Sequence, residues 1–173
     1  VWLEFVPECY LTSVRFIPDI RNCCVRVRAE SFGSEKFGMQ VFYGGRKVGE
    51  CAFPLTQYGE GECRLSEKHL WEVGKGRLYD VVLTYGKDVV HSYFGLRECA
   101  FSGEKFLLNG KSVFQRLVLD QGYHPKGLYT VPTEEEMRDE IGMATALGFN
   151  GARLHQKVFE PQFLYECDKA GYL

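Results

Sequence analysis

Features that would point to several classes of protein are missing from this chain of 173 residues. No run approaches the roughly 20 consecutive apolar residues that a membrane-spanning helix requires. The 21 Lys and Arg residues are interspersed with 23 Asp and Glu residues, so the net charge of −2 indicates no nucleic-acid partner. The chain begins at Val1 rather than Met and shows no signal-peptide pattern, and we expect that Val1 is not the native start.

The cysteines lack the spacing of a metal site or a disulfide framework. There are seven, an odd number, and no two form a C-x-x-C pair, so no zinc knuckle is predicted. Cys23 and Cys24 are neighbours in an alternating run and would point to opposite faces of a strand. We interpret the cysteines as free thiols that act as small apolar residues. Such usage favours a reducing, cytoplasmic location.

The larger, N-terminal part of the sequence has the pattern of a β-sheet. Between Leu11 and Arg97, short runs alternate apolar and polar side chains, as in strands with one buried and one solvated face. Gly44-Gly45 and Gly86-Lys87-Asp88 are suited to tight turns. About seven short strands in fewer than about 100 residues are typical of an immunoglobulin-like β-sandwich. These strands are expected at residues 13–16, 25–30, 38–43, 47–53, 61–65, 78–85 and 88–96.

Two helices are predicted in the C-terminal part. The first should begin after Thr133, which precedes Glu136 by three residues, the spacing of a capping box. Gly148 should end it, because glycine readily takes the left-handed conformation found there. The second should begin at Pro161 and stop at Gly171.

Strands are predicted to alternate with these helices. Residues 114–120 precede the first helix, residues 148–157 precede the second, and Tyr172-Leu173 would open a third strand. Asn109-Gly110 between apolar runs predicts a hairpin upstream of them. Alternation of this kind indicates parallel strands with crossover helices. Because two such units cannot bury a parallel sheet, we expect the chain to be a piece of a longer protein.

Several motifs occur in a fixed order: Phe94-Gly95-Leu96-Arg97, Phe106-Leu107-Leu108-Asn109-Gly110-Lys111, Asp120-Gln121-Gly122-Tyr123, Gly148-Phe149-Asn150, and the run from Phe163 to Gly171. Together they resemble glycoside hydrolase family 2, which contains β-galactosidases, β-glucuronidases and β-mannosidases. Members of that family have a sugar-binding jelly roll, then an immunoglobulin-like sandwich, then a (β/α)8 barrel. The resemblance is strongest from Trp71 onward, and we interpret Trp71 as a packing anchor.

The resemblance implies a mainly β chain with three parts. Residues 1–9 would be the remnant of a preceding jelly roll, with a strand at residues 1–5. Residues 10–100 would be the immunoglobulin-like β-sandwich. Residues 101–173 would be the first two βα units of an incomplete TIM barrel, with the boundary near residues 100–104. The exposed edges of such an unclosed sheet predict either self-association as a homo-oligomer or a disordered tail.

Candidate site residues lie where the predicted barrel strands end, because the carboxyl ends of barrel strands face the active site. Asp120 and His155 could exchange hydrogen bonds with sugar hydroxyls. His124 is a further substrate-binding candidate in the loop after the first strand, where Tyr123 could stack on a sugar; the alternative is a solvent-exposed loop histidine. For Arg153 an ion pair with a strand-end carboxylate is favoured over direct substrate contact.

The resemblance also implies which catalytic groups this chain lacks. Retaining glycosidases need two carboxylates about 5–5.5 Å apart. In the family both are Glu residues on later strands, which would lie beyond Leu173. The acidic residues between Glu134 and Glu140 are interpreted as a solvated helix start, and Glu160 as a helix cap. We therefore expect a fragment, inactive alone, of a retaining β-glycosidase that acts on carbohydrate without a cofactor or metal.

The sugar and the class of protein both have alternatives. The Asp-Gln-Gly-Tyr form resembles family members often labelled β-galactosidase, but Arg153 and His155 lie one residue closer together than in the well-known galactosidases. A metal site from Asp120, His124 and His155 would lack regular ligand spacing. The main rival is a non-catalytic sandwich that serves as a scaffold or carbohydrate-binding module. That reading predicts exposed aromatic side chains, with Phe32, Phe37, Tyr43 and Tyr58 as candidates.

Overall fold

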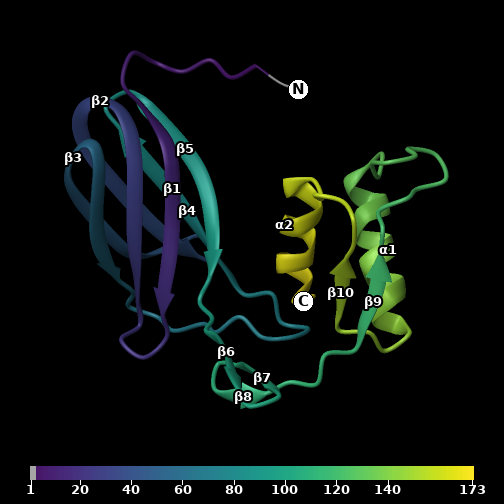
Figure 1. Cartoon of the computed structure of the whole chain (residues 1–173). Helices are drawn as coiled ribbons and strands as arrows, with labels where there is room; N and C mark the ends of the chain where they lie inside the picture. Colours follow the sequence, from purple (N-terminus) through teal and green to yellow (C-terminus); the bar gives the residue numbers. More distant parts are fainter. Residues whose placement is uncertain (1–2) are drawn as a thin grey trace. The chain divides into compact units, whose positions relative to one another are not determined.

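The computed structural model describes residues 3–173, which form two compact units (Figure 1). The first unit contains the chain up to Leu70 and the segment Leu78–Glu98. The second contains Trp71–Arg77 and Cys99–Leu173. Residues 1 and 2, part of the strand expected at residues 1–5, lie outside the described residues, and residues 3–7 form no strand. That expectation was wrong for residues 3–5, since Leu3 and Phe5 lack a neighbouring strand and are exposed.

The first unit is built on one antiparallel sheet of five strands. The long strand β2 pairs along its length with β3, while its first part pairs with β1 and its last part with β4, which in turn pairs with β5. The strands are β1 (Tyr10–Asp19), β2 (Cys24–Tyr43), β3 (Arg46–Arg64), β4 (Leu78–Tyr85) and β5 (Asp88–Gly95).

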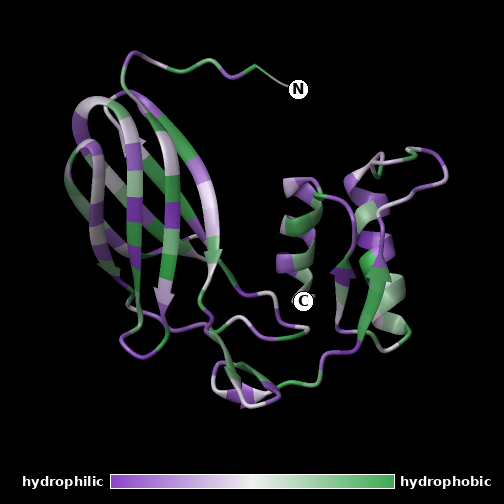
Figure 2. Ribbon diagram, viewed as in Figure 1, coloured by the Kyte–Doolittle hydropathy of each residue, from purple (hydrophilic) through white to green (hydrophobic). Residues whose placement is uncertain are grey.

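This sheet curls so that its two halves share one core. The β2–β3 register shifts between Glu30 and Ser34, where Gly33 has a φ of 97° and Gln57 on β3 a φ of 67°. Apolar residues on both sides of the bend are buried in the same cluster, Val25 and Val27 before it and Met39 and Val41 after it. The alternation of hydrophobic and hydrophilic residues along the strands is visible in Figure 2. One face of β2 and one face of β4 are thereby removed from water.

The expectation of about seven short strands was wrong in number but right about the buried faces. The predicted strands 25–30 and 38–43 are the two ends of β2, and 47–53 and 61–65 are the two ends of β3. The chain bends between them without stopping, because ladder hydrogen bonds resume beyond the irregularity. The tight turns are confirmed: Gly44 and Gly45 have φ values of 56° and 77°, and Gly86 has 57°.

The second unit contains a small antiparallel sheet, a parallel strand pair and two helices. Asn109 and Gly110 have φ values of 53° and 76°, which confirms the predicted hairpin. The parallel strands are shorter than predicted. The elements are β6 (Cys99–Ser102), β7 (Lys105–Leu108), β8 (Lys111–Ser112), β9 (Leu117–Asp120), α1 (Glu134–Ala146), β10 (Gly151–Leu154) and α2 (Pro161–Ala170).

The helix boundaries follow the predicted signals. The Thr133 hydroxyl accepts a hydrogen bond of 3.2 Å from the amide of Glu136 at the start of α1. Gly148 and Gly171 follow the two helices with φ values of 93° and 71°. Glu160 occupies the N-cap position of α2, as expected, although its side chain makes no capping hydrogen bond and instead lies 3.7 Å from the Lys157 ammonium. Neither helix within residues 3–173 is both long and apolar enough to cross a membrane.

The segment 71–77 packs within the second unit although it lies between β3 and β4 in sequence. Trp71 is fully buried, and its indole N–H donates a hydrogen bond of 2.7 Å to the carbonyl of Asp168. The side-chain amide of Asn109 donates to the Trp71 carbonyl at 2.9 Å. Gly74 donates its amide to the carbonyl of Gly171 at 2.9 Å. Trp71 is therefore a packing anchor, as expected.

Candidate functional site

The two parallel strands bring Asp120 and His155 together. β9 and β10 pair so that Asp120 lies opposite Leu154, and the amide of His155 donates a hydrogen bond of 2.8 Å to the carbonyl of Asp120. Both residues are half-buried. Because parallel strands place their carboxyl ends at one edge, the two sequence-predicted residues share that edge.

Leu173 pairs with β10 on the side opposite β9 and continues the parallel arrangement there. The amide of Leu173 donates to the carbonyl of Asn150 at 3.0 Å, and the amide of Ala152 donates to the carbonyl of Leu173 at 2.8 Å. These are the slanted bonds of parallel pairing. Leu173 thus lies where the predicted third strand should begin.

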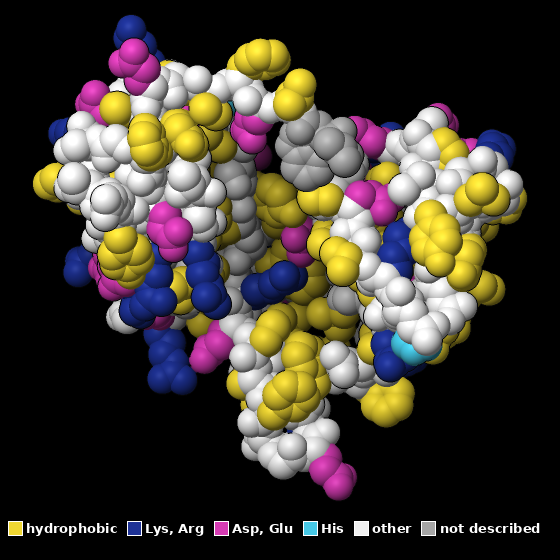
Figure 3. All heavy atoms as spheres, turned by 45° about the horizontal axis from the view of Figure 1, so that its top comes forward, with side chains coloured by type: hydrophobic (Ala, Val, Ile, Leu, Met, Phe, Trp, Pro, Cys, Tyr) yellow, Lys and Arg dark blue, Asp and Glu magenta, His cyan; other side chains and the backbone are white. Residues whose placement is uncertain are grey.

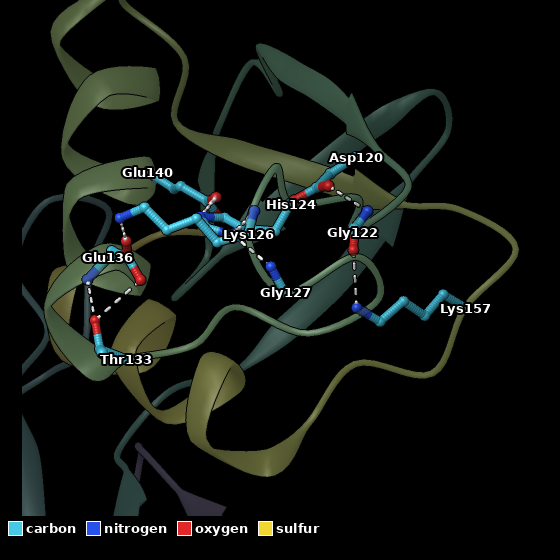
Figure 4. Close-up of polar contacts among 9 residues, drawn as sticks. All are labelled: Asp120, Gly122, His124, Lys126, Gly127, Thr133, Glu136, Glu140 and Lys157. Carbon is cyan, nitrogen blue, oxygen red and sulfur yellow. Dashed lines mark hydrogen bonds and ion pairs between the residues drawn. The ribbon is translucent and has the colours of Figure 1, made fainter.

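The carboxylate of Asp120 shapes the turn that follows β9. One of its oxygens accepts a hydrogen bond of 2.7 Å from the amide of Gly122 (Figure 4). Gly122 is buried with a φ of 68°, and a Cβ at this position would lie 2.5 Å from the Lys157 nitrogen. Only glycine suits this position, at which the loop after β9 begins to turn.

His155 is held by a neighbouring amide. The side-chain nitrogen of Gln121 lies 3.3 Å from His155 Nδ1 and also donates to the Gln156 side-chain oxygen at 3.1 Å. An amide donor at Nδ1 favours the tautomer with its proton on Nε2, because Nδ1 must then accept. The opposite nitrogen of His155 would thereby be a hydrogen-bond donor.

His124 is a buried part of the loop rather than a solvent-exposed residue. Its side chain is only 9% exposed, and Nδ1 accepts hydrogen bonds from the amides of Lys126 at 3.2 Å and Gly127 at 3.3 Å. Nε2 lies 3.8 Å from a carboxylate oxygen of Glu140 on α1 (Figure 4). Burial raises the pKa of Glu140, and the nearby His124 charge opposes that rise. The histidine thus orders the loop against α1.

Lys157 was not selected from the sequence, yet it holds the same loop. Its side chain is 10% exposed, and its ammonium donates to the carbonyls of Gly122, at 3.2 Å, and Tyr129. The same nitrogen lies 4.5 Å from the centre of the Phe159 ring. A buried ammonium needs such partners to offset its lost hydration. No sequence pattern pairs a lysine with distant carbonyls, so this role could not have been predicted.

Two tyrosines expose an aromatic surface on this loop. Tyr123 is 66% exposed and Tyr129 57% exposed, with ring centroids 5.1 Å apart and hydroxyl oxygens 3.2 Å apart. The hydrogen bond to Tyr129 raises the pKa of Tyr123. Hydrophobic side chains are visible on the surface of this unit in Figure 3. Exposed rings of this kind can pack on the apolar face of a sugar.

Arg153 and the acidic residues occupy different surroundings. Arg153 lies opposite Leu119 in the β9–β10 register, is exposed, and makes no ion pair with any residue in the described part of the chain. Its predicted structural ion pair stays a prediction.

The buried carboxylate of Glu166 on α2 lies 3.4 Å from Arg138 and 3.2 Å from Lys169, so it is held by two cations.

The predicted site residues do not converge on one point that could bind a metal. Asp120, His124 and His155 each make separate contacts, to a backbone amide, a loop and a glutamine. Among residues 3–173 there is no group of three or more His, Cys, Asp or Glu side chains placed to hold a metal ion. The geometry instead provides hydrogen-bonding groups beside exposed aromatic rings, which suits a polyhydroxylated ligand.

Sequence comparison finds relatives among sugar hydrolases, although no family model matches. The chain is 25% identical over 124 residues to a β-galactosidase of Staphylococcus xylosus, which covers 72% of this chain and 12% of that protein. It is 26% identical over 113 residues to a β-galactosidase of Thermoanaerobacterium thermosulfurigenes, covering 63% of this chain and 16% of that protein. The chain therefore spans less than a fifth of the length of these curated relatives.

Structural comparison gives a shared fold over almost the whole chain. A β-glucuronidase of Ruminococcus gnavus matches 97% of this chain with a TM-score of 0.83 and 19% identity, over 29% of its own length. β-Glucuronidase 3 of Bacteroides uniformis matches 97% of this chain with a TM-score of 0.81 and 23% identity, over 23% of its own length. Both sets of relatives confirm the resemblance to glycoside hydrolase family 2 that the sequence motifs indicated.

Proposed function

We propose that this chain is part of a retaining β-glycosidase of glycoside hydrolase family 2, β-galactosidase-like in its substrate. The relatives named above are β-galactosidases by sequence and β-glucuronidases by structure. All are hydrolases of β-glycosides, so the bond type is common to both groups while the sugar differs. The preference for galactose rests on the curated relatives and on the Asp120-Gln121-Gly122-Tyr123 motif.

In this proposal the chain has the three parts expected from its sequence. Residues 10–100 form an immunoglobulin-like sandwich, which is supported by the curled sheet and its single core. Residues 101–173 open a (β/α)8 barrel, which is supported by two parallel strands followed by helices and by the third position at Leu173. Residues 1–9 belong to a preceding domain.

The observation that carries the proposal is the hydrogen bond that sets Asp120 beside His155 at the carboxyl ends of β9 and β10. In a barrel, that edge faces the substrate. Asp120 accepts a hydrogen bond from a sugar hydroxyl, and His155 donates one from Nε2. His124 contributes to substrate binding by ordering the loop that would contact the sugar. Arg153 pairs with a carboxylate on a neighbouring strand.

The acid/base and the nucleophile lie outside this chain. In a retaining mechanism one carboxylic acid protonates the glycosidic oxygen while a carboxylate attacks the sugar, and water then releases the glycosyl group. Asp120 cannot supply both groups, and its hydrogen bond to Gly122 commits one oxygen to the turn. The chain alone is therefore inactive, and its residues bind and orient the sugar.

A panel of chromogenic aryl β-glycosides tests the proposal. Each substrate is offered to this chain and to a longer product of the same gene that contains a complete barrel. Hydrolysis by the longer protein alone is the expected result, and the best substrate identifies the sugar. If the longer protein is folded but hydrolyses none of the glycosides, the proposal is wrong.

The alternative is a non-catalytic sandwich that binds carbohydrate or serves as a scaffold. Two of its predicted aromatic residues are exposed, Phe32 at 61% and Tyr58 at 57%, whereas Phe37 is fully buried. Phe32 also stacks on Tyr10 with ring centroids 5.6 Å apart. Under this alternative, replacing Phe32 and Tyr58 by Ala would abolish retention on immobilised polysaccharide, and hydrolysis by the longer protein would be absent.

A further inference from the structure

Two of the seven cysteines face each other where β3 folds back on itself. The bend of β3 near Gln57 places its first part in one half of the curled sheet and its last part in the other. The amide of Ser66, just after the end of β3, donates a hydrogen bond of 2.8 Å to the carbonyl of Val48 near the start of that strand. Cys51 and Cys63 lie between this contact and the bend. The two parts of β3 that carry Cys51 and Cys63 are therefore close to each other both at this hydrogen bond and at the bend.

Between this hydrogen bond and the bend, side chains from one part of β3 pack against glycines of the other part. A Cβ added at Gly49 would lie 3.0 Å from Cys63 Sγ, and Cβ atoms added at Gly59 and Gly61 would lie 2.9 Å and 2.5 Å from the Phe53 ring. Cys51 lies between Gly49 and Phe53 on the same face of the strand, because side chains alternate. It therefore points toward Cys63. Each of the two thiols is close enough to shift the pKa of the other, and the Cys63 thiol also donates a hydrogen bond of 3.8 Å to the carbonyl of Arg64.

This close approach is unusual for two facing layers of sheet. Facing sheets normally lie about 10 Å apart, whereas a disulfide needs Cα atoms about 4.4–6.8 Å apart. The glycines at positions 49, 59 and 61 remove the side chains that would otherwise separate the two parts of β3. The backbone hydrogen bond between Ser66 and Val48 is possible only at such short range.

We propose that Cys51 and Cys63 form an intrachain disulfide when the protein meets a low-molecular-weight disulfide such as oxidised glutathione. The Cys51 thiolate attacks one sulfur of the oxidant, forming a mixed disulfide and releasing one glutathione thiolate. That thiolate takes the proton of Cys63, whose sulfur then attacks the Cys51 sulfur and releases the second glutathione as a thiolate, which takes up from solvent the proton that Cys51 lost on ionising. The two cysteines are oxidised, and two molecules of reduced glutathione are formed.

The environments of the two thiols set this order of attack. Cys51 is half-buried, whereas Cys63 is fully buried. The neighbouring Cys63 side chain lowers the pKa of the Cys51 thiol, while the neighbouring Cys51 side chain and burial raise the pKa of Cys63. The thiol that a solvent-borne oxidant can reach is therefore also the one that ionises first. The other five cysteines need not take part.

Mass spectrometry of the oxidised full chain tests the proposal. The chain is incubated with oxidised glutathione, its remaining thiols are alkylated, and it is cleaved with trypsin without reduction. Residues 48–64 contain both cysteines and no internal Lys or Arg. We expect this peptide to escape alkylation and to weigh less than the reduced form by two hydrogen atoms. A second cleavage, after the glutamates at positions 50, 60 and 62, should leave the piece with Cys51 joined to the piece with Cys63 until a reductant is added.

Variants separate this pair from the other thiols. Cys63→Ala should retain glutathione on Cys51, because the resolving thiol is gone, whereas Cys99→Ser should leave the cross-link unchanged. Thermal unfolding gives a second readout: oxidation should raise Tm by roughly 10 °C in the parent and in Cys99→Ser, but not in Cys51→Ala. Full alkylation of both cysteines after oxidation, or a cross-link that persists in Cys51→Ala, would overturn the proposal.

Discussion

An oxygen of the Asp120 carboxylate accepts a hydrogen bond of 2.7 Å from the amide of Gly122. This bond leaves the second carboxylate oxygen for another partner, and our proposal assigns it to a sugar hydroxyl. The same residue therefore has a structural contact and a proposed binding contact. The two can be separated, because an asparagine side chain also accepts a hydrogen bond in a turn of this kind.

Asp120→Asn should lower activity without unfolding the loop. In the longer protein we expect kcat/KM on the best aryl glycoside to fall by about 10- to 100-fold, the usual range for losing a hydrogen bond to a charged group. The free energy of unfolding should change by less than about 1 kcal/mol, since the Gly122 amide keeps an acceptor. His91→Ala is the matched control, and its kcat/KM should equal that of the parent. Unchanged activity in Asp120→Asn would remove Asp120 from the proposed site.

Lys157→Met should destabilise the loop between β9 and α1. Methionine keeps the length of the side chain but leaves the carbonyls of Gly122 and Tyr129 without their ammonium donor. We expect a loss of about 2–3 kcal/mol in the free energy of unfolding, measured by urea denaturation. Amide hydrogen exchange in residues 121–132 should accelerate.

Lys105→Met, at an exposed position on β7, is the control for the loss of one positive charge. Its free energy of unfolding should lie within about 0.5 kcal/mol of the parent value. Equal effects of the two substitutions would show that the buried contacts of Lys157 contribute nothing measurable.

Local rules explain which parts of this fold could be predicted. Thr133, Gly171 and Asn109-Gly110 act on their immediate neighbours, so the helix boundaries and the hairpin followed from the sequence. The continuity of β2 and β3 did not, because the irregularity opposite Gly33 depends on pairing between distant strands. Glycine can either end a strand or bend it, and only the register shows which.

The candidate site, like the fold, was predictable only where neighbouring residues determine it. Asp120 and His155 could be selected because each ends a predicted strand, and parallel pairing then brings them together. Lys157 could not, since its carbonyl partners lie 35 and 28 residues away in sequence. The burial of His124 was also missed, because its contact with Glu140 depends on how the loop packs against α1.

Asn150→Ala should weaken the pairing of the two parallel strands. The buried side chain of Asn150 accepts a hydrogen bond of 2.8 Å from the amide of Arg116 and donates one of 2.9 Å to the carbonyl of Phe114. Alanine leaves both backbone groups unpaired, and we expect a loss of about 2–4 kcal/mol in the free energy of unfolding. Gln115→Ala, an exposed neighbour, should change it by less than about 0.5 kcal/mol. A small effect of Asn150→Ala would mean that water replaces both bonds.

Tyr79→Phe should make the first unit less stable at neutral pH and less sensitive to alkali. The fully buried Tyr79 hydroxyl donates to the carbonyl of Glu67 at 2.9 Å and accepts from the amide of His69 at 2.7 Å. Phenylalanine loses both bonds, which should cost about 1–3 kcal/mol. Burial raises the pKa of Tyr79 from 10 to about 12, because the phenolate would be poorly solvated.

The sign of the pH effect follows from this raised pKa. Between pH 10 and about 12 the unfolded chain loses the Tyr79 proton while the folded chain keeps it, so the unfolded state binds fewer protons and stability falls as pH rises. The contribution is fully present below pH 10. Urea unfolding of the parent and of Tyr79→Phe from pH 8 to 12 should therefore give a difference that is largest below pH 10 and narrows toward pH 12. A difference that stays constant across this range would mean that Tyr79 ionises equally easily in both states, and that burial does not restrain it.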